Sequence, residues 1–213
     1  MFNIPIMIEV FSEMEIIDEY INLMEQRATF LTAQLGDRLF HQNKDDSDDM
    51  EITEDLRESC QYLAETAFLY NLRSSIVITL WSTYESNVIR IAERWKTKNK
   101  KFCTIHHRNG KGGFLERATK YYAEEIEISL TETSDDYSQL KTLYLVRNAL
   151  AHGSGYRESV SRRIWHELQR IERNTKSIST TLNQVGITKE FTRESFIAVR
   201  KNLTRLSNLL PML

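Results

Sequence analysis

The sequence predicts an all-α fold, an antiparallel bundle of helices. Its two prolines, Pro5 and Pro211, both lie near the ends, and its seven glycines are thinly spread over 213 residues. Because these residue types interrupt helices, their scarcity in the interior favours long helices. Apolar residues also recur at steps of three and four, as on the buried face of a helix. No segment shows the strict alternation that is typical of a strand.

An N-terminal helix is expected within residues 1–41, where Val10, Met14 and Ile17 fall on one apolar face. Residues 42–53 should form an acidic linker. The linker lacks the spaced ligands and the glycine of an EF-hand loop. A solvated connection is therefore favoured over a calcium site.

The second helix should span roughly residues 54–98. Thr53 can cap its first turn, because a threonine hydroxyl accepts a hydrogen bond from a free backbone amide there. The second half of this helix carries an apolar stripe that includes Val77, Tyr84 and Val88. A stripe that continues over several turns indicates a helix that faces the inside of a bundle.

The remaining helices are shorter and complete the predicted bundle. A core is expected over residues 54–185, with further helices at about 114–127, 135–152 and 157–185, and a C-terminal helix within residues 188–213. The whole chain is therefore interpreted as one helical domain.

Composition indicates an ordinary globular chain. Charged residues make up 27%, apolar residues 41%, and the net charge is −2. Cys60 and Cys103 are too few for a disulfide framework. The N-terminus lacks a basic flank and a cleavage site, and no apolar run is long enough to span a membrane. We therefore expect a cytoplasmic protein with no membrane contact.

The segment 145–153, Leu-Val-Arg-Asn-Ala-Leu-Ala-His-Gly, is the most informative part of the chain. On a helix, Val146 and Leu150 would face the core, while Asn148 and His152 share a second face. Arg147 would lie about 140° around the helix from His152. Either its side chain curls around, the last helical turn loosens, or two protomers share one site.

This segment resembles the motif of the HEPN superfamily (higher eukaryote and prokaryote nucleotide-binding domains). Arg147, Asn148 and His152 match the family pattern, with four residues between the arginine and the histidine. The helix 72–95 is similar to an earlier helix of its nuclease branches, and the resemblance covers roughly residues 55–185. It implies an endoribonuclease that acts as a homodimer, in a toxin–antitoxin or antiviral defence system, with an antitoxin or another regulatory protein as partner.

The residue types suit RNA cleavage without a metal or another cofactor. In that reaction the ribose 2′-hydroxyl attacks the adjacent phosphorus, leaving a 2′,3′-cyclic phosphate and a 5′-hydroxyl. His152 can transfer the proton near neutral pH. Arg147 can stabilise charge on the phosphoryl oxygens, and Asn148 can orient the histidine or bind the phosphate. The alternative for His152 is a helix-terminal histidine that binds the last carbonyls.

Three further side chains are candidates for a supporting role. Glu85 lies in the earlier helix, where it either approaches the active centre or faces solvent. Tyr144 and Tyr156 flank the motif and could stack on bases, although tyrosines at the edge of a bundle more often serve packing.

A basic stretch follows the second helix and is a candidate for binding the RNA backbone. A solvated loop is the equal alternative. Cys103, His106 and His107 lack the paired spacing of a zinc module, so no metal site is expected. The candidate RNA-binding residues are Lys96, Lys98, Lys100, Lys101, Arg108 and Lys111.

Two other functions stay open on sequence grounds. The chain could be a non-catalytic HEPN bundle that binds RNA or nucleotide or scaffolds a complex. It could also be a plain helical interaction protein.

Overall fold

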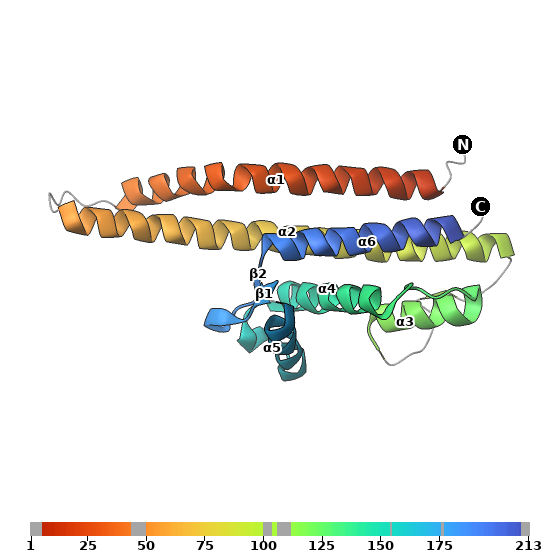
Figure 1. Cartoon of the computed structure of the whole chain (residues 1–213). Helices are drawn as coiled ribbons and strands as arrows, with labels where there is room; N and C mark the ends of the chain where they lie inside the picture. The colour runs from red at the N-terminus through yellow and green to blue at the C-terminus, as the bar shows by residue number, and fades with distance from the viewer. Residues whose placement is uncertain are drawn as a thin grey trace.

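The computed structural model describes residues 6–43, 50–99, 104–105, 112–153, 155–175 and 177–209, except for the side chains of residues 50–52 and 153. Within these ranges, its long helices alternate in direction along the chain (Figure 1). α1 forms one outer layer, α2 and α6 lie side by side in the middle, and α4 lies beneath them with the short α3 (Figure 1). This arrangement confirms the all-α antiparallel bundle. The long helices are α1 (Ile6–Asn43), α2 (Met50–Asn99), α4 (Ser134–Gly153) and α6 (Lys189–Leu209).

The buried core contains the apolar stripes expected from the sequence. Val10 and Met14 of α1 are buried, as are Val77, Tyr84 and Val88 of α2. The core extends beyond the expected 54–185 region, because α1 and α6 each bury an apolar face against α2. Both terminal helices are therefore integral parts of the bundle.

α2 begins at Met50, earlier than the expected residue 54. Thr53 consequently lies inside the helix, so its prediction as the N-terminal cap is wrong. The four residues 50–53 include no proline or glycine that would delay the helix start. Of the expected linker, residues 42–43 belong to α1, and residues 44–49 lie outside the described part.

α3 (Phe114–Tyr121) continues directly into the π-helical turn η1 (Tyr122–Ile126). Glu127 then adopts a left-handed conformation, with a φ of 63°, and ends the turn. The expected helix at 114–127 is thereby confirmed, although its last turn is wider than an α-helix.

The fifth helix was expected to continue to residue 185, and this prediction is wrong, as is the expectation that the chain has no strand. α5 stops at Thr175 and is followed by a two-stranded antiparallel hairpin. In chain order the elements are η2 (Arg157–Ser159), α5 (Arg162–Thr175), β1 (Ile178–Ser179), η3 (Thr181–Asn183) and β2 (Gly186–Ile187).

Hydroxyl side chains explain why α5 ends early. The carboxylate of Glu172 accepts hydrogen bonds from the backbone amide and the hydroxyl of Thr180. The hydroxyl of Thr188 donates to the carbonyl of Ser177 over 2.8 Å. Because serine and threonine offer the backbone such alternative partners, the apolar spacing over 175–185 does not suffice for a helix. Leu182, which continues the apolar spacing of α5, is 84% exposed.

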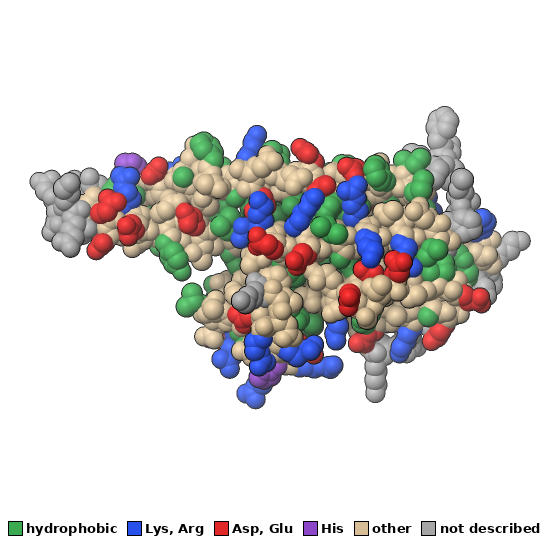
Figure 2. Space-filling model, in the orientation of Figure 1, with side chains coloured by type: hydrophobic (Ala, Val, Ile, Leu, Met, Phe, Trp, Pro, Cys, Tyr) green, Lys and Arg blue, Asp and Glu red, His purple; other side chains and the backbone are tan. Residues whose placement is uncertain are grey.

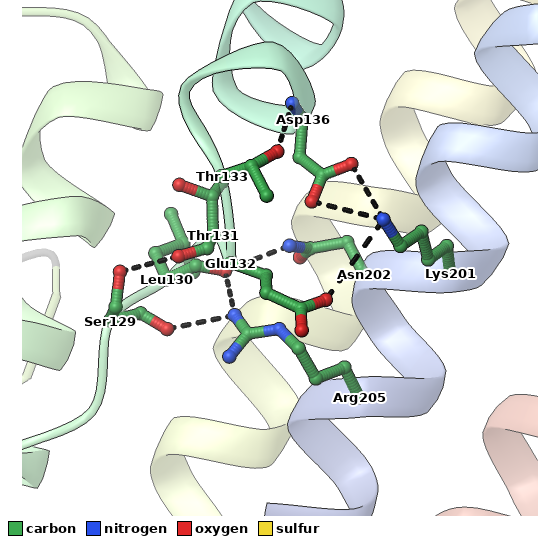
Figure 3. A network of polar contacts seen from close by, with 9 residues as sticks. All are labelled: Ser129, Leu130, Thr131, Glu132, Thr133, Asp136, Lys201, Asn202 and Arg205. Atoms are coloured by element: carbon green, nitrogen blue, oxygen red, sulfur yellow. Dashed lines mark hydrogen bonds and ion pairs between the residues drawn. The ribbon is translucent and has the colours of Figure 1, made fainter.

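A polar network joins α6 to the loop that precedes α4 (Figure 3). The side-chain amide of Asn202 donates to the carbonyl of Leu130 over 2.8 Å, and its oxygen accepts from the Tyr84 hydroxyl over 3.2 Å. The guanidinium of Arg205 donates to the carbonyls of Ser129 and Leu130. These contacts hold the start of α4 against α2 and α6.

Candidate functional site

α4 turns its apolar face to the core and its polar motif away from it. Leu140, Leu143 and Val146 are fully buried and Leu150 is 6% exposed, as helical geometry predicted. Because these side chains pack against α2 and α6, Asn148 is directed to the opposite side of α4. There it lines a cavity together with other residues of the second face.

Arg147 and Asn148 are both half-buried and form a direct contact. Nη1 of Arg147 donates to Oδ1 of Asn148 over 2.9 Å. The guanidinium therefore reaches toward the face that carries Asn148. Nε of Arg147 is buried and has no hydrogen-bond partner among the described residues. A buried donor without a partner costs about 1–3 kcal/mol.

His152 lies exposed in the last turn of α4. Beyond it the amide of Gly155 donates to the carbonyl of Ala149 over 3.1 Å, which closes the end of the helix. Gly155 has a φ of +72°, and a Cβ there would lie 2.6 Å from the Tyr70 hydroxyl. A glycine is therefore required at this turn.

Within one chain, the motif residues divide into two groups. Arg147 contacts Asn148, while no hydrogen bond joins His152 to either of them in the described ranges. One alternative considered from the sequence was that the side chain of Arg147 curls around the helix. It does so far enough to contact Asn148, but in the part of the chain that the structure describes it forms no hydrogen bond with His152. The sharing of a site between two protomers stays a prediction.

A cavity of about 420 Å³ opens between α4 and α5 beside the motif. Its volume falls in the range of small-molecule sites. Its wall combines cationic, anionic and aromatic side chains. The lining residues are Gly112, Gly113, Leu115, Glu116, Tyr137, Lys141, Tyr144, Leu145, Asn148, Ser161, Arg163, Ile164 and Glu167.

An aromatic wall connects this cavity to α2. The rings of Tyr144 and Trp81 lie 4.9 Å apart between centroids. The indole nitrogen of Trp81 in turn donates to Glu85 over 2.9 Å. Glu85 is half-buried, so it does not simply face solvent. Glu85 accepts a hydrogen bond from the aromatic wall. Among the described residues, it forms no hydrogen bond with a motif side chain.

Tyr156 is 49% exposed and pairs with Gln184 through an isolated β-bridge. It is absent from the residues that line the cavity beside Asn148. Of the two candidate tyrosines, the structure therefore places only Tyr144 in the wall of this cavity.

The candidate basic stretch is only partly described. Lys96 forms an ion pair with Glu93 over 3.4 Å, while Lys98 is exposed. Lys100, Lys101, Arg108 and Lys111 lie outside the described residues, as do the histidine and cysteine candidates for a metal. In the described ranges, no group of three or more His, Cys, Asp or Glu residues is arranged to hold a metal ion.

A second basic surface, which sequence reasoning missed, lies on α5. Figure 2 shows Lys, Arg and His side chains gathered over this helix at the lower edge of the view. The signal was present in the sequence as a helical repeat of cationic side chains. We call this surface the α5 basic face, and it consists of Arg162, Arg163, His166, Arg170 and Arg173.

Searches against protein-family profiles, curated proteins and solved structures found no match to this chain. In the described part of the chain, no helix has both the length and the apolar character needed to cross a bilayer.

Proposed function

We propose that this chain is a metal-independent endoribonuclease of the HEPN type that acts as a homodimer. The observation that carries the proposal is the hydrogen bond between Arg147 and Asn148 at the edge of an open cavity, with His152 exposed on the same helix. A charge-stabilising group, a polar orienting group and a proton-transferring group thus occupy one helix end. The motif resemblance supplies the reaction class.

In the proposed reaction, the 2′-oxygen of a ribose forms a bond to the adjacent phosphorus, and the bond from phosphorus to the 5′-oxygen breaks. His152 transfers protons between these oxygens. Arg147 donates hydrogen bonds to the phosphoryl oxygens, whose negative charge grows in the transition state. Asn148 holds the guanidinium through its side-chain oxygen and leaves its amide hydrogens free to bind the substrate.

The dimer brings Arg147 and Asn148 of one protomer together with His152 of the other. This arrangement overcomes the rotation of about 140° that separates the two side chains on a single helix. Two-fold symmetry then creates two identical sites per dimer. A role as a toxin or antiviral effector, restrained by an antitoxin, is part of the same proposal.

Two single variants test the catalytic assignment. Arg147→Ala and His152→Ala should each lower the rate of RNA cleavage by at least about 100-fold. Arg38→Ala and His41→Ala serve as controls, since they remove the same residue types from exposed positions on α1. Cleavage is followed on total RNA, with end-group analysis of the products. Undiminished cleavage by both site variants would refute the assignment. Binding without cleavage by the unmodified protein would favour a non-catalytic bundle.

A mixing experiment tests the shared site. Arg147→Ala and His152→Ala protomers are combined and allowed to exchange. If each site takes its arginine and histidine from different protomers, a heterodimer keeps one intact site, and about a quarter of the activity should return. If each site lies within one protomer, the mixture stays inactive, and the shared site is excluded.

A further inference from the structure

α5 separates apolar and cationic side chains onto opposite sides. Trp165, Leu168 and Ile171 are buried and attach the helix to the bundle. On a helical projection, the α5 basic face occupies an arc of about 100° on the other side. All of its side chains are exposed, and no acidic residue falls within this arc.

This concentration of charge does not stabilise the helix itself. Like charges four residues apart, such as Arg162 and His166 or His166 and Arg170, destabilise a helix by about 0.2–0.5 kcal/mol per pair when both are charged. Arg162 and Arg163 also lie in the first turn, where the helix dipole disfavours cations. Neither arginine forms an ion pair with another described residue, whereas Arg170 binds Glu167 over 2.8 Å. Arg163 interacts with Glu167 only through longer-range electrostatics, so both arginines suit an anionic ligand from outside the chain.

The α5 basic face leads directly into the cavity beside the motif. Arg163 belongs to both, and Lys141 and Asn148 line the same cavity from α4. A linear polyanion lying along α5 would therefore reach the cavity at Arg163, and the wall of the cavity also contains Lys141 and Asn148.

The cavity also offers groups that can bind a base. Glu116 and Glu167 carry negative charge on its wall, beside the cations noted above, and Tyr144 provides an aromatic surface. Hydrogen bonding by Arg170 lowers the pKa of Glu167, which keeps that carboxylate ionised. Carboxylates accept hydrogen bonds from the exocyclic amino groups of bases. A tyrosine ring can stack on an unpaired base.

We propose that the α5 basic face binds the sugar–phosphate backbone of single-stranded RNA, and that the cavity receives one unpaired base next to the cleaved linkage. The choice of RNA rests on the proposed function. The single strand follows from the cavity, because a base can enter it only when it is neither paired nor stacked. The base should carry an exocyclic amino group, as adenine and cytosine do.

The test uses the His152→Ala protein, so that the RNA stays intact and binding is measured separately from cleavage. Fluorescence anisotropy with a labelled single-stranded oligonucleotide gives Kd at several salt concentrations. Arg162→Gln with Arg163→Gln should weaken binding by about tenfold. Each lost phosphate contact on a single strand should lower the slope of log Kd against log salt by about 0.7. The control, Arg27→Gln with Arg38→Gln, removes two exposed arginines from α1 and should change neither quantity.

Binding by the α5 double variant equal to that of the control overturns the proposal, even if the protein cleaves RNA. Absence of RNA binding overturns it as well. If the α5 double variant binds RNA more weakly but the unmodified protein does not cleave RNA, the α5 basic face is supported as the binding surface. The proposed endoribonuclease activity is then refuted. A duplex with the same number of phosphates that binds as tightly as the single strand overturns the single-strand assignment.

A second variant tests the base. Glu116→Gln keeps the size of the side chain and removes its charge. The parent protein should prefer oligoadenylate or oligocytidylate to oligouridylate, and Glu116→Gln should reduce this preference. If the parent protein and Glu116→Gln show the same base preference, the base assignment is overturned. The assignment of the sugar–phosphate backbone to the α5 basic face depends only on the α5 double variant.

Discussion

Replacing Asn202 by alanine tests whether α6 anchors the loop that positions α4. Asn202 is 3% exposed and lies between the carbonyl of Leu130 and the hydroxyl of Tyr84. The variant removes both hydrogen bonds. The Leu130 carbonyl keeps its bond from Arg205. The Tyr84 hydroxyl, in contrast, loses the acceptor to which it donates in a fully buried position.

The expected cost follows from these contacts. A hydrogen bond contributes about 0.5–1.5 kcal/mol net, and a buried polar group left without a partner costs about 1–3 kcal/mol. Burial raises the pKa of Tyr84, so its hydroxyl stays a neutral donor that needs an acceptor. Asn202→Ala should therefore lower the free energy of unfolding by about 2–4 kcal/mol.

Urea denaturation followed by far-ultraviolet circular dichroism measures this loss. Lys201→Ala is the matched control on the neighbouring position. It breaks exposed ion pairs with Asp136, over 3.2 Å, and with Glu132, over 3.9 Å, and should cost about 0–1 kcal/mol. In a Tyr84→Phe background, Asn202→Ala should cost about 1 kcal/mol less, since no hydroxyl is left without a partner. Equal costs for Asn202→Ala and Lys201→Ala would refute the anchoring role of Asn202.

Two further predictions concern the region around α5. Leu182 is 84% exposed and has a φ of 54°, a conformation that costs a residue other than glycine about 1–2 kcal/mol. Leu182→Gly should therefore raise the free energy of unfolding by about 0.5–1 kcal/mol after the entropy of the unfolded glycine is subtracted. Leu182→Ala keeps the strained backbone conformation and should not raise the free energy of unfolding. Equal stability of the two variants in urea denaturation would contradict this reasoning. Arg170→Gln should raise the pKa of Glu167 toward its ordinary value, because the hydrogen bond from Arg170 is the main cause of the lowering. The stabilisation from this pair is present above the ordinary pKa and is lost as pH falls through the lowered one. Carboxyl-carbon NMR titration measures the shift, and an unchanged Glu167 pKa would exclude the contact in solution.

The sequence alone was sufficient for the helical class and for the orientation of α4. Apolar residues at steps of three and four along α1, α2 and α6 indicate which side of each helix faces the core. The same rule correctly placed Val146 and Leu150 inside and Asn148 on another face. These features are local, since the turn of an α-helix relates residues that are close in the chain.

Contacts between distant segments decided the rest. The apolar spacing continues after Thr175 and would allow a helix. A hairpin forms there instead, because Glu172 and Thr188 form hydrogen bonds with the backbone of Thr180 and Ser177. The cavity beside Asn148 exists because α5 packs against α4, so no single segment contains its signal. The motif and the cationic repeat of α5 can each be read from the sequence. Only tertiary packing brings Arg163 and Asn148 to one surface. Their proximity depends on how segments that are distant in the sequence pack around a shared core.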